Sequence, residues 1–284
     1  MKYLVPTDFS GNAKNAVEYA AALANATHAE LIYIHVVTPI GNDIHPRGNV
    51  EAEVVKAKRA DAKTQLETLL IKVQTAYKGL ISDYLIRTGD AVEEITKTAQ
   101  NKADIIIMGT HGASGMKKFF FGSNTASVIE ESAIPVLAIP ENCAFVIPKK
   151  IVFATDYYDS DLSAMIILTK IAEKFNSEIC IVHIVVGGVK PEAEFPALNN
   201  FLNTVIKTTG YTKTSCRVYS HETIEKGIDL VIKEEEADIF AVSTRKRNPL
   251  EKLFNKSTSK ELSYGSKIPL LIFRVNESKS ESIF

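Results

Sequence analysis

Tryptophan is absent from this 284-residue sequence, and cysteine is scarce, with three residues in all. Cys143, Cys180 and Cys216 are odd in number and far apart, which excludes a disulfide framework and a CxxC metal site. Cysteine usage of this kind is typical of a reducing compartment, so we expect a cytoplasmic protein. Cys180 stands within an apolar run, which predicts a buried, unreactive thiol.

An excess of charge and long apolar runs are absent as well. Lys plus Arg number 33 and Asp plus Glu number 34, so no overall field favours binding to nucleic acid or to an anionic membrane. No apolar run approaches the roughly 20 residues that cross a bilayer, and the run at 3–5 is too short for a signal peptide. We therefore expect a soluble protein in which any phosphate-binding function depends on local geometry.

The sequence contains an internal repeat. Four segments of the first half recur in the same order in the second half, first at an offset of 148 residues and then at 134. The matching pairs are 2–8 with 150–156, 30–36 with 178–184, 103–108 with 237–242, and 134–139 with 268–273. The fall in offset places a net deletion of 14 residues in the middle of the second copy. Because two copies are too few for a solenoid, we predict two paired domains, 1–144 and 145–284.

Within the first copy, short apolar strands alternate with helical patterns. The expected strands are 2–6, 30–37, 81–87, 104–108 and 135–139, and the expected helices are 11–26, 50–77, 90–101 and 123–132. This alternation is typical of a parallel sheet with helices on both faces and right-handed crossovers. We therefore predict an α/β fold of two doubly wound domains, each a five-stranded parallel sheet, and for the strand order we adopt the hypothesis 3-2-1-4-5.

A glycine-rich segment follows the expected strand 104–108, with the spacing Gly109-x2-Gly112-x9-Gly122-Ser123. Glycine leaves no Cβ between backbone N–H groups and an anion. Gly122-Ser123 opens the next helix, and a helix N-terminus carries free N–H donors and a positive partial charge. Ser123 is suited to cap that helix or to contact a phosphate. A plain strand-to-helix turn explains Gly109 and Gly112 equally well, but the third glycine and the serine favour phosphate binding.

We expect the end of the first strand to lie beside the glycine-rich segment. Ligands of doubly wound sheets bind where the strand order reverses, which the order 3-2-1-4-5 puts between the first and fourth strands. Their ends carry Pro6-Thr7-Asp8 and Met108-Gly109. Asp8 is able to accept hydrogen bonds from a ribose or to help hold a metal ion bound to phosphates. Its alternative role is to cap the helix that starts near Ser10, which Ser10 could also do.

With these motifs, the sequence resembles a tandem universal stress protein over almost its whole length. The glycine spacing of the first copy matches the signature of the ATP-binding branch of that family. The resemblance implies that ATP is the ligand, with or without Mg²⁺. The residues it implies around adenine and ribose are Pro6, Thr7, Asp8 and Val36, and those around the phosphates are Met108, Gly109, Gly112, Gly122, Ser123 and Asn124. His111, within the same loop, is a further candidate.

The resemblance also implies how the copies pair. Family members pair through their last strand, which here implies pseudo-twofold packing of 135–139 against 269–274. The second domain is then an internal dimer partner, and further assembly into a homo-oligomer stays open.

The second copy departs from the glycine pattern. Ser243, Lys246 and Lys256 stand where the first copy has its three glycines, so ATP binding in the same pose is not expected there. The basic residues around them form either a solvated surface or an anion site that uses side-chain charge. Without the glycines, Asp156 is expected to cap a helix.

Catalytic and metal-binding patterns are missing from the sequence. No HxxxH or Cys/His cluster indicates zinc, and no Ser/His/Asp set indicates nucleophilic catalysis. His35 and His183 end equivalent expected strands, where a hydrogen-bonded structural role is the commoner one. We therefore predict a stress-response regulatory protein that binds ATP in its first domain. The alternatives are a slow ATPase or autophosphorylating enzyme with Ser123 or a nearby hydroxyl as acceptor, and a scaffold that binds no nucleotide.

Overall fold

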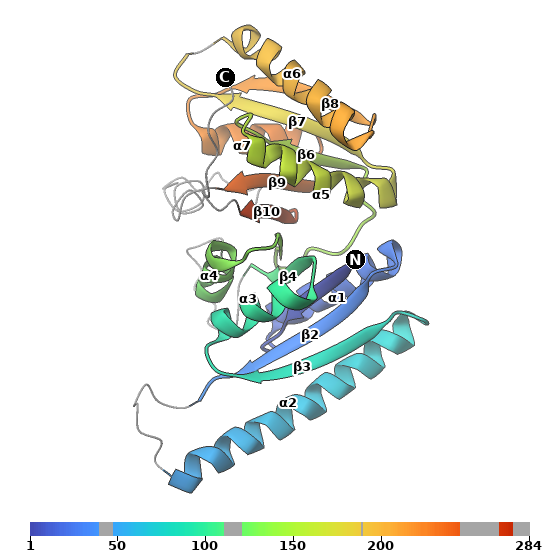
Figure 1. Ribbon diagram of the computed structural model, residues 1–284, viewed down its shortest axis with the longest axis vertical. Helices are drawn as coiled ribbons and strands as arrows, with labels where there is room; N and C mark the ends of the chain where they lie inside the picture. Colours follow the sequence, from blue (N-terminus) through green and yellow to red (C-terminus); the bar gives the residue numbers. More distant parts are fainter. Residues whose placement is uncertain (40–47, 111–120, 189, 245–266, 275–284) are drawn as a thin grey trace. The chain divides into compact units, whose positions relative to one another are not determined.

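The chain folds into two compact units that divide between Phe145 and Val146. The computed structural model describes residues 1–39, 48–110, 121–188, 190–244 and 267–274. Within each unit, strands lie side by side and helices cover them (Figure 1).

In the described part of the first unit, strands and helices alternate along the chain. The strands are β1 (Lys2–Pro6), β2 (Glu30–Val37), β3 (Ser82–Thr88), β4 (Ile105–Gly109) and β5 (Val136–Ile139). The helices are α1 (Gly11–Thr27), α2 (Gly48–Ala76), α3 (Ala91–Lys102) and α4 (Ser123–Glu131). All of them lie close to the ranges that the hydrophobic pattern predicts.

The strands of the first unit pair in parallel in the order β3-β2-β1-β4-β5, which confirms the predicted order. The chain moves outward from β1 to β3 and then returns to β4. Right-handed crossovers therefore place α1 and α2 on one face of the sheet and α3 and α4 on the other. Consistent with this, α3 contacts α4, and α2 runs along the edge strand β3 (Figure 1). The strand order reverses between β1 and β4.

Small residues let α1 approach the sheet closely. Ala16, Ala20, Leu23 and Ala24, which the pattern predicts on one helix face, are all buried. The helix begins after Ser10, whose Oγ accepts the N–H of Ala13 at 3.2 Å. This start leaves residues 7–10 as a short loop at the carboxyl end of β1.

The second unit repeats the first. Its strands are β6 (Lys150–Ala154), β7 (Glu178–Val185), β8 (Thr214–Ser220), β9 (Ile239–Thr244) and β10 (Leu270–Arg274). Its described helices are α5 (Asp159–Phe175), α6 (Pro191–Thr209) and α7 (Ile224–Glu234). The parallel order β8-β7-β6-β9-β10 again corresponds to 3-2-1-4-5. Much of the deletion falls in α6, which has 19 residues where α2 has 29.

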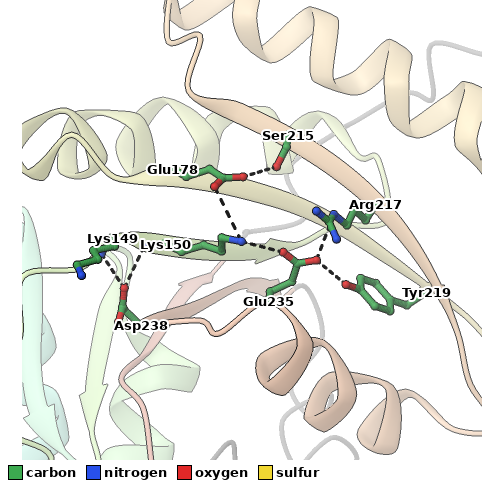
Figure 2. Close-up of polar contacts among 8 residues, drawn as sticks. All are labelled: Lys149, Lys150, Glu178, Ser215, Arg217, Tyr219, Glu235 and Asp238. Atoms are coloured by element: carbon green, nitrogen blue, oxygen red, sulfur yellow. Dashed lines mark hydrogen bonds and ion pairs between the residues drawn. The ribbon is translucent and has the colours of Figure 1, made fainter.

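A buried carboxylate follows α7 in the second unit. Glu235 is 2% exposed. Its carboxylate accepts hydrogen bonds from Tyr219 Oη at 2.5 Å and Lys150 Nζ at 3.2 Å, and Arg217 Nε lies 3.3 Å away (Figure 2). We call Lys150, Arg217, Tyr219 and Glu235 the Glu235 cluster. It joins the start of β6 to β8 and to the end of α7.

The partners decide the charge state of Glu235. Burial by itself would raise the pKa of Glu235, but the hydrogen bonds from Tyr219 and Lys150, with the charges of Arg217 and Lys150, lower it overall. Nearby, Cys180 is fully buried on β7, and burial raises the pKa of its thiol to about 12. The predicted burial of this thiol is confirmed, and the raised pKa favours the protonated, less nucleophilic form.

Candidate functional site

A cavity of about 320 Å³ opens at the carboxyl end of the first sheet, where the strand order reverses. The ends of β1, β2 and β4 and the first turns of α3 and α4 contribute to it. The residues that line it are Pro6, Thr7, Asp8, Ala13, Ile34, His35, Val36, Thr38, Ala91, Ile95, Met108, Gly109, Gly122, Ser123, Asn124 and Thr125.

Most of the residues predicted for the site line this one cavity. Nine of the eleven do so, namely Pro6, Thr7, Asp8, Val36, Met108, Gly109, Gly122, Ser123 and Asn124. His111 and Gly112 lie outside the described residues. Sequence reasoning does not select the apolar residues that α3 brings, Ala91 and Ile95, because no motif marks them. Thr38 does follow a strand end, as Asp8 does, and that signal could have found it.

The loop after β1 holds Asp8 at the cavity. Thr7 N donates to Ile34 O at 2.9 Å, and Thr7 Oγ1 accepts the N–H of Phe9 at 3.1 Å. Phe9 has a φ of 62°, a left-handed backbone that a non-glycine residue adopts only when its surroundings impose it. The exposed Asp8 carboxylate accepts the N–H of Ser10 at 3.0 Å. Ser10 caps α1, so Asp8 does not serve as the helix cap.

His35 braces the same loop from β2. Its Nδ1 lies 2.8 Å from Thr7 O, and its ring stacks on Phe9 with centroids 4.7 Å apart. Because a carbonyl oxygen only accepts, Nδ1 carries a proton and donates it to Thr7 O. The predicted hydrogen-bonded role of His35 is confirmed. This stacking, the hydrogen bond from Phe9 N to Thr7 Oγ1 and the contact of His35 with Thr7 O explain the left-handed φ of Phe9.

The start of α4, which the sequence predicts to lie near phosphates, forms another side of the cavity. Gly122 is the N-cap residue, with φ −65° and ψ 159°, and no side chain of the described residues caps the helix. Ser123 is therefore the first helical residue, and the alternative that it caps α4 is wrong. Thr125 Oγ1 donates to Gly109 O at 2.8 Å, which ties the first turn of α4 to the end of β4. The helix thus presents uncapped backbone donors and its positive end to the cavity.

Comparisons with known proteins identify the first unit. A sequence model of the universal stress protein family matches residues 1–140. A universal stress protein of Methanocaldococcus jannaschii is 32% identical over 155 residues, which cover 49% of this chain and 93% of that protein. The chain belongs to the universal stress protein family. A universal stress protein of Thermus aquaticus is similar at 31% identity over 137 residues, 48% of this chain and 96% of the relative.

A solved structure extends the likeness to both units of this universal stress protein. The crystal structure of a universal stress protein from Archaeoglobus fulgidus covers 96% of this chain and 98% of its own, with a TM-score of 0.72. At 19% identity, this likeness concerns the fold alone. It agrees with two universal stress protein folds in tandem, as the internal repeat predicts.

Two further features concern the described residues of this universal stress protein. Among the described residues, no helix has the length and apolar character needed to span a membrane. Within the same part of the chain, no three or more His, Cys, Asp or Glu side chains gather in a way that could hold a metal ion.

The second universal stress protein unit keeps the loop but changes its surroundings. His183 Nδ1 lies 2.7 Å from Thr155 O, and its ring lies 4.5 Å from that of Tyr157, whose φ is 64°. These contacts repeat those of His35, and the predicted hydrogen-bonded role of His183 is confirmed. Asp156 lies 3.6 Å from His183 Nδ1. The N-cap of α5 is Tyr158, so the prediction that Asp156 caps a helix is wrong. Lys246 and Lys256 lie outside the described residues.

Proposed function

We propose that the first unit binds ATP in the cavity between β1 and β4, and that the protein acts as a stress-response regulator through this site. One observation carries the proposal, namely that the uncapped start of α4 and the Asp8 loop line one cavity. A volume of about 320 Å³ is at the lower end of the usual range for small-molecule sites. Nucleotide phosphates suit a helix N-terminus, because its free N–H groups and dipole favour an anion.

The lining residues divide by chemistry in a way that suits the parts of ATP. Ile34, Val36 and Ile95 form an apolar wall for a base. Asp8, at the mouth, is a hydrogen-bond acceptor for ribose hydroxyls and a ligand for a Mg²⁺ ion that accompanies the phosphates. Gly122 has no Cβ to hold the phosphates away from the backbone of α4.

The second unit has a supporting part in this proposal. Its described residues lack the glycine at the end of the fourth strand, where Ser243 replaces Gly109. We expect it to serve as the internal dimer partner, pairing 269–274 with 135–139 as the family resemblance implies. Nucleotide occupancy of the first unit would then be read out through this pairing or by a partner protein.

Titration calorimetry with ATP, with and without Mg²⁺, tests the proposal. We expect saturable binding of one ATP per chain in the micromolar to millimolar range. Gly122→Lys, which imitates Lys256 of the second copy, should weaken binding at least about tenfold. The backbone angles of Gly122 are open to any residue, so the variant should fold.

Gly11→Lys is the matched control. Gly11 starts α1, lies outside the cavity lining, and has open space where a Cβ would stand. We expect its ATP affinity to stay within about twofold of wild type. Absence of saturable binding would overturn the proposal and favour a scaffold without nucleotide. Equal losses in both variants would overturn the placement of ATP at the start of α4. Phosphate release followed in the same samples tests the ATPase alternative.

A further inference from the structure

One pair of equivalent residues distinguishes the two units at the site. Helices α1 and α5 each have 17 residues and are offset by 148 positions. The third residue is Ala13 in α1 and Asp161 in α5, and both are buried, with exposures of 7% and 2%. Ala13 lines the cavity of the first unit. The second unit therefore carries a carboxylate where the first has only a methyl group.

The Asp161 carboxylate is held in place by hydrogen bonds. Its Oδ2 accepts bonds from Thr155 Oγ1 at 2.7 Å, Asp156 N at 3.2 Å and Tyr158 N at 3.3 Å. It also lies in the first turn of α5, where the helix dipole favours a negative charge. Three donors and a helix N-terminus hold this oxygen as they would hold an oxygen of a bound anion.

The corresponding hydroxyl in the first unit has no partner like Asp161, because Ala13 stands at that position. Thr7, the counterpart of Thr155, lines the cavity, and its Oγ1 accepts the N–H of Phe9. Within the described part of the chain, no atom accepts the hydroxyl proton of Thr7. That proton is available to an oxygen of a ligand, whereas the proton of Thr155 is taken by Asp161.

We propose that Asp161 is a tethered anion that closes the second unit to nucleotides and other phosphate esters, independently of its missing glycines. It fills space that Ala13 leaves open, it occupies the hydroxyl donor of Thr155, and it places a fixed negative charge where phosphates would approach. The account of Ala13 rests on the proposed ATP site of the first unit. The account of Asp161 rests on its own contacts.

Substitutions of Ala13 in the first unit test whether a carboxylate at this position excludes ATP. Ala13→Asp should weaken ATP binding at least about 30-fold, because a carboxylate meets the phosphates. Asparagine has nearly the same volume as aspartate but no charge, so Ala13→Asn should weaken ATP binding by less than about tenfold. Adenosine, which carries no phosphate, should lose affinity about equally in both variants. A residue that acts only as a helix cap would leave ATP binding of Ala13→Asp within about twofold of wild type, and that result overturns the proposal.

A second experiment, which needs no ATP, asks whether a small carboxylate restores the stability of a variant that lacks Asp161. Asp161→Ala leaves the hydroxyl of Thr155 and two backbone N–H groups without their acceptor, so it should lower the melting temperature. Formate at about 100 mM should raise the melting temperature of this variant more than that of wild type, by mass action on the vacated site. Asp161→Asn, which keeps an acceptor of the same size, is the matched control. Formate should raise its melting temperature no more than that of wild type.

The two arms separate the possible failures. If wild type does not bind ATP, the proposed function fails and the formate result alone decides the role of Asp161. Equal formate effects on all three proteins would overturn the proposal, because the donors would then not form an anion site.

Discussion

Replacing Glu235 by glutamine should destabilise the second unit by about 2–3 kcal/mol at neutral pH. The side chain is 1% exposed and accepts from Tyr219 and Lys150. Breaking a buried ion pair costs about 3–5 kcal/mol. Here the cost is lower, because the side chains of Lys150 and Arg217 are 26% and 60% exposed and can rehydrate. The Tyr219 bond contributes about 1 kcal/mol of this loss, because glutamine still accepts it but as a neutral rather than a charged acceptor.

The effect should depend on pH in one direction. The folded pKa of Glu235 is lowered, so its contribution is complete above the unfolded pKa of about 4.3 and is lost as the pH falls through the folded value. The difference between wild type and Glu235→Gln should therefore be largest at neutral pH. It should shrink as the pH falls below about 4.3.

Urea unfolding with circular dichroism, at neutral and at acid pH, measures both effects. Hydrogen exchange by mass spectrometry places the loss, since peptides from β8 and α7 should exchange faster in the variant. The matched control is Glu178→Gln in the same region. Glu178 lies 3.9 Å from Lys150 and is 43% exposed, so its loss should be below about 1 kcal/mol. Equal losses for the two variants, or a Glu235→Gln loss that does not change with pH, would refute the reasoning.

Three further substitutions test individual contacts by urea or thermal unfolding. Thr125→Val removes the buried bond to Gly109 O, and we expect a loss of about 1–2 kcal/mol and weaker ATP binding in calorimetry. Asp90→Ala removes the acceptor of two N–H groups at the start of α3, at a cost of about 1 kcal/mol. Gly227→Ala places a Cβ 2.5 Å from Ile184 Cγ2, so overpacking should cost about 1–3 kcal/mol.

Each of these substitutions has a conservative control. Thr125→Ser and Asp90→Asn keep the hydrogen-bonding group, so both should stay close to wild type in stability. Gly11→Ala adds the same methyl group as Gly227→Ala at a position with nothing within 4 Å, and it should not destabilise the protein. A control that loses as much stability as its partner would contradict the assigned contact.

Several features of this protein can be read from the sequence because they depend on residues close together in the chain. The repeat follows from matched segments, the alternation of strands and helices follows from periodicity, and the order 3-2-1-4-5 agrees with a common order of doubly wound sheets. Gly109 marks the end of the fourth strand, and the Pro6-Thr7-Asp8 run marks the end of the first. The predicted order makes these two strands neighbours. For the same reason, nine predicted residues line one cavity.

Other features were decided only by the tertiary structure. Ile95 reaches the cavity because α3 crosses the sheet from β3 to β4. No local sequence pattern predicts which residues of α3 then face the cavity. Glu235 stands in an acidic run that resembles a solvated helix end, yet Lys150, 85 residues away, and Tyr219 make it a buried acceptor. Asp161 looks like an ordinary first-turn acid until its contact with Thr155 is seen. Burial and hydrogen bonding are set by what distant segments bring to a side chain, whereas periodicity and turn chemistry are set by its neighbours in the chain.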